Sequence, residues 1–146
     1  MTDLEKIKRW LGTYPGYDIL SRFRVDYTDQ VPANAGIFPG GLVEIERRED
    51  LLGNVTVSNQ YNFALYYVLA KADDDDAGAT ENADWIMDFQ RWVQNQSVRR
   101  LAPRFGNTDT RESIQAQNGV LYEQEDEGVA VYMVQLSVQF ETFYEV

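Results

Sequence analysis

Residues 129–144 read Val-Ala-Val-Tyr-Met-Val-Gln-Leu-Ser-Val-Gln-Phe-Glu-Thr-Phe-Tyr, and apolar side chains recur at every second position. The apolar series runs from Ala130 to Phe140, whereas Gln135, Ser137 and Gln139 occupy positions between its members. A period of two residues is typical of a strand with one buried face. The stretch therefore predicts a β-strand that packs on a core with one side only.

The predicted strand is unusually long. Natural strands have about 5 or 6 residues, whereas a straight strand over residues 129–144 would be roughly 50 Å long. A compact domain of this chain length is only about 38 Å across. We therefore expect either that the strand bends sharply or that part of it leaves its own domain to contact a neighbouring molecule.

The N-terminal third predicts a helix and a loop. An amphipathic helix is expected from Thr2 or Asp3 to Leu11, closed by Gly12. A short strand is expected over Phe23–Tyr27. Gln30–Gly41 contains two prolines and three glycines, so a loop is predicted there.

Two further strands are predicted on either side of the turn signal Gly53-Asn54. They cover Leu42–Glu49 and Val55–Lys71. The second half of the longer strand is apolar on both sides and is expected at the centre of a sheet. Its first half, Thr56–Asn62, is polar enough to predict an edge or an interface.

A second helix is predicted to begin with Thr80 as its N-cap and to end near Arg99 and Arg100, before Pro103. Its apolar stripe is interpreted as core rather than as a ligand box, and consists of Trp85, Ile86, Phe89, Trp92 and Val93. A strand over Ser113–Glu123 then forms a hairpin with the last strand. This order predicts a single domain over residues 1–146, an α+β fold whose mostly antiparallel sheet has long strands and two main helices packed on one face.

The composition excludes several classes of function. The chain has no cysteine and no histidine, which removes thiol chemistry, disulfides and the usual general base near neutral pH. A net charge of −11 argues against a nucleic-acid-binding surface. No basic leader and no run of about 18 apolar residues is present, so we expect a soluble, cytosolic protein without a membrane segment.

Acidic residues are the remaining candidates for catalysis or metal binding. The run Asp73–Asp76 lacks the spacing of a calcium loop and is interpreted as a solvated loop without a specific metal. Glu44 and Glu46 share a strand face, as do Glu123 and Glu125, but paired acids on a strand are ordinary. Residues 36–41 precede a strand and not a helix, so they do not predict a phosphate cradle. We expect no enzyme activity and no cofactor.

Charge is unevenly distributed along the chain. Residues 73–88 contain seven acids and no base, whereas residues 91–111 contain five arginines and one acid. This polarity suits a subunit that meets charged neighbours on different sides, and two ordinary solvated faces are the alternative.

Two stretches carry a resemblance to a known family. They are Trp-Ile-Met-Asp-Phe-Gln-Arg-Trp-Val at 85–93 and Val-Tyr-Met-Val-Gln-Leu-Ser-Val-Gln-Phe at 131–140. With them, the chain resembles the small tail-completion proteins of long-tailed bacteriophages and prophages, which include the tail terminators and minor capsid proteins. The likeness covers nearly the whole chain in its element order and its acidic character.

The resemblance implies a structural protein of the virion that is made in the host bacterial cytoplasm. Such proteins share an α+β fold and assemble with copies of themselves into a ring, commonly a hexamer, although a monomer in isolation is compatible with the resemblance. The ring caps the tail tube and joins it to head-completion proteins. It also gives the long strands a use, because they could extend the sheet of a neighbour.

Particular residues are expected to contribute to this assembly. The loop of Asp73, Asp74, Asp75 and Asp76 is expected to face the ring lumen, where negative charge keeps passing DNA from binding. Subunit contacts are expected at Val31, Phe38, Val57 and Asn59. The alternatives are a phage head–tail connector subunit and, from a different class, a small carboxylate-dependent enzyme or ligand-binding module.

Overall fold

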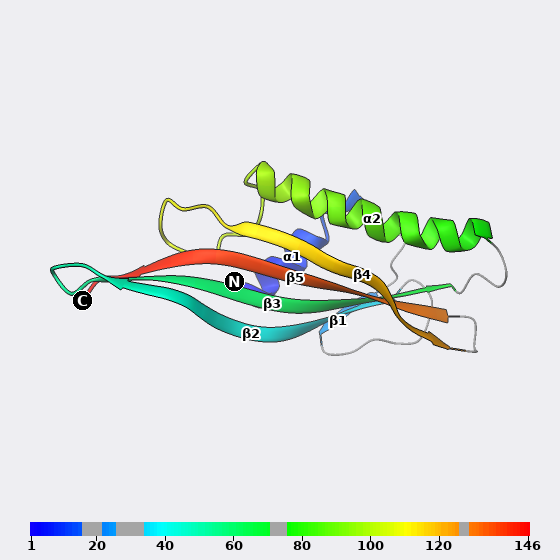
Figure 1. Ribbon diagram of the computed structural model, residues 1–146, viewed down its shortest axis with the longest axis horizontal. Helices are drawn as coiled ribbons and strands as arrows, with labels where there is room; N and C mark the ends of the chain where they lie inside the picture. Colours follow the sequence, from blue (N-terminus) through cyan, green and yellow to red (C-terminus); the bar gives the residue numbers. More distant parts are fainter. Residues whose placement is uncertain (16–21, 26–33, 71–75, 126–128) are drawn as a thin grey trace.

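The computed structural model describes residues 1–15, 22–25, 34–70, 76–125 and 129–146 (Figure 1). In chain order the elements are α1 (Asp3–Leu11), β1 (Arg22–Val25), β2 (Asn34–Glu49), β3 (Val55–Ala70), α2 (Asp76–Val98), β4 (Ser113–Glu125) and β5 (Val129–Tyr144). They form a five-stranded sheet and two helices. This confirms the predicted α+β fold class with its mostly antiparallel sheet.

The strand order in the sheet is β1-β2-β3-β5-β4. The β2–β3, β3–β5 and β5–β4 pairs are antiparallel, and β1 pairs with β2 in parallel. Strands β3 and β5 pair along their full lengths of 16 residues, from Val55 opposite Tyr144 to Ala70 opposite Val129. The long last strand is therefore fully paired within its own chain, and the sheet as a whole is elongated.

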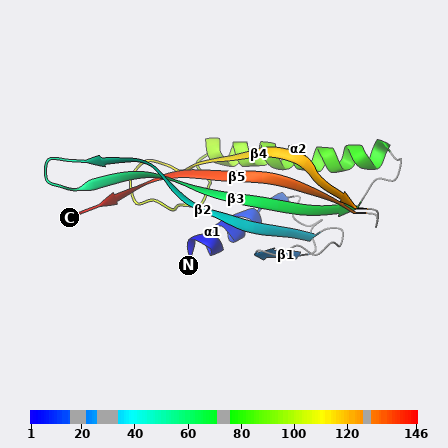
Figure 2. The same cartoon turned by 60° about the horizontal axis from the view of Figure 1, so that its bottom comes forward.

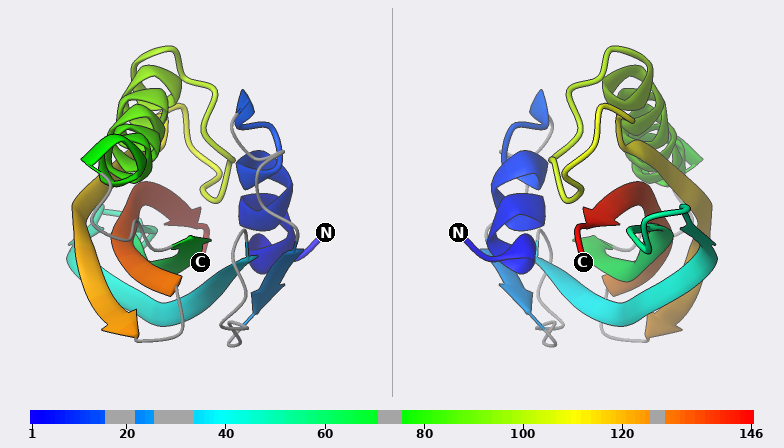
Figure 3. Two further views of the ribbon diagram at one scale, coloured as in Figure 1. Left: turned by 90° about the vertical axis from the view of Figure 1, so that its right-hand side faces the viewer. Right: turned by 90° about the vertical axis from the view of Figure 1, so that its left-hand side faces the viewer.

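The core lies between the concave face of the curved sheet and the two helices, as Figure 3 shows. In β5, Val134, Leu136 and Val138 are buried, whereas Gln135 and Gln139 are exposed. The alternation in the sequence thus separates the core face of this strand from the outer face, as predicted. Further core residues from the helices and strands are Ile7, Leu11, Ile37, Phe63, Leu65, Ile86, Phe89, Val93 and Ile114.

Helix α1 begins at a capping box. The Glu5 backbone N–H donates to the Thr2 hydroxyl at 3.2 Å, and the Thr2 N–H donates to the Glu5 carboxylate at 3.4 Å. These bonds satisfy backbone donors that a helix N-terminus otherwise leaves unpaired. The cap and Gly12 at the C-terminal end confirm the predicted limits of the helix.

Aromatic side chains connect the two helices. The rings of Trp10 and Trp92 stack with centroids 4.7 Å apart, and the Trp10 indole N–H donates to Gln96 at 3.0 Å. Phe89 is buried, and Trp85 packs against the core beside it. The interpretation of the α2 aromatic stripe as core is therefore confirmed.

The predicted loop over Gln30–Gly41 is wrong for most of its length, because β2 already begins at Asn34. The pairing with β3 shifts register between Pro39 and Gly41, and Gly41 has a φ of +96°. The helix- and strand-breaking residues therefore form a β-bulge within the strand rather than a loop. Proline is tolerated there because β1 ends at Val25, opposite Ile37, and leaves the outer edge of β2 without a paired strand in the described structure.

Two other boundaries differ from the sequence predictions. Thr56–Asn62 does not form an edge, since β3 pairs with β2 on one side and with β5 on the other. Helix α2 begins at Asp76, so Thr80 lies inside it and is not its N-cap. Acidic residues stabilise a helix N-terminus through the helix dipole, which allows α2 to start within the acidic run.

Helix α2 ends in a Schellman motif. The Leu101 N–H donates to the Gln96 carbonyl at 2.9 Å, and the Arg100 N–H donates to the Ser97 carbonyl at 3.1 Å. Arg100 has a φ of +61°, in the left-handed region that usually takes glycine at this position. The two arginines expected at the end of the helix thus follow it directly.

Candidate functional site

The sheet extends beyond both helices as an arm, which comprises residues 42–60 and 140–144 (Figures 1 and 2). It contains the end of β2, the β2–β3 turn, the start of β3 and the end of β5. Five of its aliphatic side chains are exposed, namely Leu42, Val43, Ile45, Leu51 and Leu52. Single exposed aliphatic residues are normal, but a group on one projecting element is typical of an interaction surface.

The tip of the arm is a rigid turn. The Asp50 carboxylate accepts from the backbone N–H groups of Leu52 at 2.8 Å and Asn54 at 2.9 Å. Gly53 has a φ of +85°, which suits glycine, and its N–H donates to the Asp50 carbonyl at 3.1 Å. Between these anchors, the side chains of Leu51 and Leu52 are 106% and 84% exposed. The turn therefore holds two leucines in water at a fixed position.

A groove of about 460 Å³ lies on the inner face of the arm. Its walls include Leu42, the ion pair of Glu44 and Arg47 at 2.7 Å, and Tyr144. The groove is small and polar on one side, and its ion pair is exposed to solvent. It thus offers a shallow contact surface with both signs of charge.

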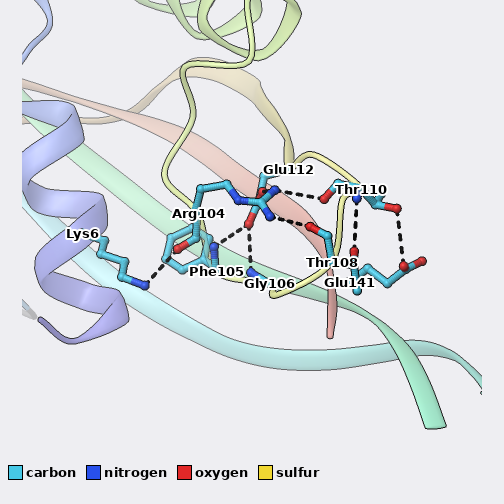
Figure 4. A network of polar contacts seen from close by, with 8 residues as sticks. All are labelled: Lys6, Arg104, Phe105, Gly106, Thr108, Thr110, Glu112 and Glu141. Atoms are coloured by element: carbon cyan, nitrogen blue, oxygen red, sulfur yellow. Dashed lines mark hydrogen bonds and ion pairs between the residues drawn. The ribbon is translucent and has the colours of Figure 1, made fainter. Parts of the chain in front are cut away.

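The loop between α2 and β4 supports the root of the arm (Figure 4). The Glu112 side chain is buried and accepts from Arg104 at 2.6 Å, from the Phe105 N–H, and from the Gly106 N–H at 2.9 Å. The Arg104 guanidinium also donates to the carbonyls of Thr108 and Thr110. One buried carboxylate thereby fixes the path of the whole loop.

This loop covers the edge of β5 where β4 no longer pairs with it. The Asn107 side chain donates to the Phe143 carbonyl at 2.9 Å and accepts from the Phe143 N–H at 2.7 Å. A Cβ on Gly106 would lie 2.1 Å from the carbonyl oxygen of Glu141, so only glycine fits this close approach. The loop therefore holds the last part of β5 in the arm.

The predicted contact residues have different outcomes. Val57 and Asn59 line the inner groove of the arm, but each is only 6% exposed because neighbouring side chains of the arm cover it. Phe38 belongs to β2, where its backbone is opposite Ala64, and not to a loop. Val31 lies outside the described residues.

The acidic candidates do not form a site in the described residues. Asp73, Asp74 and Asp75 lie outside them, and Asp76 is the first residue of α2. A bulge at residue 45 places Glu44 opposite Asn59 and Glu46 opposite Ser58, so the prediction that the two glutamates share a face is wrong. In the ranges that the structure describes, no group of acids is arranged to bind a metal ion.

Two tyrosines at the junction of α1 with its neighbours have raised pKa values. Burial is the main cause of the raised pKa of Tyr14, and the charge of Asp88 adds to it. Burial also raises the pKa of Tyr61 to about 12, with further contributions from its hydrogen bond to Asp3 and from nearby negative charge. Both phenols act as neutral groups that join α1 to the sheet and to α2.

Sequence reasoning missed the two leucines at the tip and the network around Glu112. The turn signal at residues 53–54 was visible, and the adjacent leucines could have been recognised as exposed from it. The role of Glu112 had no sequence signal, because its partners come from a loop without a motif.

The sequence was compared with known protein families and curated proteins, and the helices were compared with the length and hydrophobicity of membrane spans. No protein-family model matches the sequence, and no curated protein matches it significantly. Neither helix, over the residues that are described, is long and apolar enough to cross a membrane.

Proposed function

We propose that the protein is a structural subunit of a virion, similar to a phage tail terminator, which assembles with its own copies into a ring that caps the tail tube. The observation that supports this proposal most is the arm, with Leu51 and Leu52 held in solvent at its tip. A projecting, apolar element on a rigid scaffold is costly to leave exposed and is typical of a docking surface. The proposed role needs neither a catalytic group nor a cofactor.

The exposed tip can supply useful assembly energy. Complete burial of one leucine side chain contributes about 1.5–3 kcal/mol, so the pair contributes roughly 3–6 kcal/mol for each contact. Association also costs several kcal/mol for lost freedom of motion. Contacts of this size give weak pairs but stable closed rings, because each subunit of a ring makes two contacts.

The first experiment measures the native mass of the protein over a wide range of concentrations, with electron microscopy of any oligomer. We expect discrete oligomers that grow in population with concentration and appear as rings with an axial opening. The double variant Leu51→Asp, Leu52→Asp should remain folded by circular dichroism and lose the oligomer. Arg9→Glu, at an exposed position of α1, is the matched control, since it also changes the net charge by two units.

A monomer at every concentration tested would contradict self-assembly. Rings that persist unchanged in the double leucine variant would show instead that the tip is not a contact. If rings form, their addition to growing phage tail tubes should stop tube elongation.

The acidic run Asp73–Asp76 is expected to act on DNA and not on subunit contacts. We propose that residues 73–76 face the ring lumen and keep DNA from binding there. Replacing Asp73, Asp74, Asp75 and Asp76 with asparagine should leave the ring intact and increase its retention of duplex DNA at low salt. Unchanged DNA retention would argue against a lumenal position.

A further inference from the structure

A second groove lies at the opposite edge of the sheet from β2. It has a volume of about 690 Å³ and runs between α2 and the edge strand β4. Met87 and Val98 of α2 line it with exposed apolar side chains, and Asp88 and Arg91 contribute both signs of charge. On the strand side it is lined by residues 113–117 of β4.

Both outer edges of the sheet lack a neighbouring strand in the described part of the chain. In β2, residues 39–49 are all exposed and lie beyond the segment that pairs with β1. In β4, the last strand of the order, 13 residues form the opposite edge, and within this strand the Ile114 N–H donates to the Ser97 hydroxyl of α2 at 3.1 Å. Unpaired strand edges are templates for pairing with another chain. The two edges are of similar length, so each could pair with the other in a second copy.

The directions of the strands suit this pairing. The β2–β3, β3–β5 and β5–β4 pairs are all antiparallel, so β2 runs antiparallel to β4 across the sheet. A second copy that is shifted sideways without being turned over therefore presents its β2 antiparallel to β4. This continues the alternating pattern of the sheet from one molecule to the next.

The charges at the ends of the two edges are complementary. Residues 42–50 carry four exposed acids, Glu44, Glu46, Glu49 and Asp50, against two exposed bases, Arg47 and Arg48. Exposed Arg99, Arg100 and Arg111 lie just beyond α2 and before β4. Figures 1 and 2 show that the C-terminal end of α2 points toward the same end of the molecule as the arm tip. A β2 edge that lies along β4 therefore directs its tip toward the end of the other copy at which these arginines lie.

We infer that the β2 edge of one copy docks in the groove between α2 and residues 113–117 of β4 in the next copy. This inference rests on the proposed function, because it names the surface through which the copies associate. The contact joins two different surfaces and repeats from subunit to subunit, as a ring requires. A symmetric β2–β2 dimer would instead close into isolated pairs and leave the β4 edge uncovered.

The pairing also specifies which side chains become neighbours. Val43 lies opposite Gln60, which lies opposite Gln139, which lies opposite Ser113, so all four share the outer face. Leu42 lies opposite Tyr61 and shares the inner face. In the docked state, Val43 is therefore adjacent to the outer-face residues of β4, and Leu42 projects toward α2.

Disulfide cross-linking tests this arrangement, because the chain contains no cysteine of its own. Val43→Cys is mixed in turn with Ser113→Cys, Gln115→Cys and Gln117→Cys, which sample three registers about 7 Å apart. Leu42→Cys is the matched control, since its exposure of 54% is close to the 48% of Val43 but it faces the other side. Two cysteines on adjacent strands can form a disulfide only when their Cβ atoms point to the same face of the sheet.

We expect at least one Val43 mixture to give a mixed disulfide dimer at a yield tenfold or more above the matching Leu42 mixture. Equal yields from Val43 and Leu42, or a dominant Val43–Val43 dimer, would overturn the inference. If native mass shows oligomers but no mixed dimer forms, the inference fails while the proposed self-assembly stands. If the protein stays monomeric at all concentrations and no cross-link forms, both fail.

Discussion

Replacing Glu112 with alanine should be the most damaging single change outside the apolar core. The side chain is 4% exposed, and its loss leaves the N–H groups of Phe105 and Gly106 without their acceptor. A buried unpaired donor costs about 1–3 kcal/mol, and we take about 1 kcal/mol for each of these half-buried groups. The lost ion pair with Arg104 adds about 1 kcal/mol, because this guanidinium is partly exposed and keeps its bonds to two carbonyls.

The expected loss in the free energy of unfolding is therefore about 2–4 kcal/mol. Urea denaturation of dilute monomer measures it, and the slope of the transition should stay unchanged. Glu112→Gln keeps one acceptor oxygen but places an amide donor against other donors, so about half of the loss is expected. Glu44→Ala is the control, since it breaks an exposed ion pair that contributes at most about 1 kcal/mol.

The same variant should loosen the arm locally. The Phe143 amide donates to Asn107, which is held in place by the loop that Glu112 organises. Hydrogen exchange at Phe143 should therefore accelerate more in Glu112→Ala than global unfolding explains. The reasoning would be refuted if the free energies of unfolding of Glu112→Ala and Glu44→Ala differed by less than about 0.5 kcal/mol and hydrogen exchange at Phe143 were unchanged.

Three further predictions concern packing and titration. Gly106→Ala should destabilise the fold by about 1–3 kcal/mol through its clash with β5, whereas Gly12→Ala, at a φ of −64°, should be neutral or slightly stabilising in the same urea assay. Phe89→Ala should lower the free energy of unfolding by about 3–5 kcal/mol, and Met87→Ala, which is exposed on the same helix, should leave it nearly unchanged. Because the pKa of Tyr61 is about 12 in the fold and 10.0 in its absence, the folded state binds more protons in between, so stability is fully present below pH 10 and falls as the pH rises toward 12. Tyr61→Phe should make urea midpoints between pH 10 and pH 12 less dependent on pH, and an unchanged dependence would contradict that assignment.

The limits of the elements with strong periodicity were predictable. The last strand has the bounds Val129–Tyr144 that its alternation indicated, and α1 begins after its Thr2 cap. Both signals are local, since they depend on side-chain spacing and on hydrogen bonds within one turn. The α2 stripe was likewise sufficient to assign Phe89 to the core.

The errors arose where tertiary pairing overrides local preference. Prolines and glycines in residues 34–41 predicted a loop, but the neighbouring strand β3 pairs with this segment and accommodates the irregularity as a bulge. The same kind of irregularity at residue 45 separated Glu44 from Glu46. The polar start of β3 was expected at an edge or an interface, but it lies between two strands. A central position is possible because Thr56, Ser58 and Gln60 face outward, although Asn59 is buried on the inner face.

The sequence by itself determined the type of fold, the approximate positions of the helices and of the long strands β3 and β5, and the absence of cysteine and histidine chemistry. These properties follow from composition and from periods of two and 3.6 residues, which are present in any single stretch of chain. Only the tertiary structure decided that the long strands pair with one another and project as an arm with leucines at its tip. It also decided that a buried carboxylate at residue 112 fixes the root of that arm. Both depend on contacts between segments that are distant in sequence, whose register and direction local patterns do not specify.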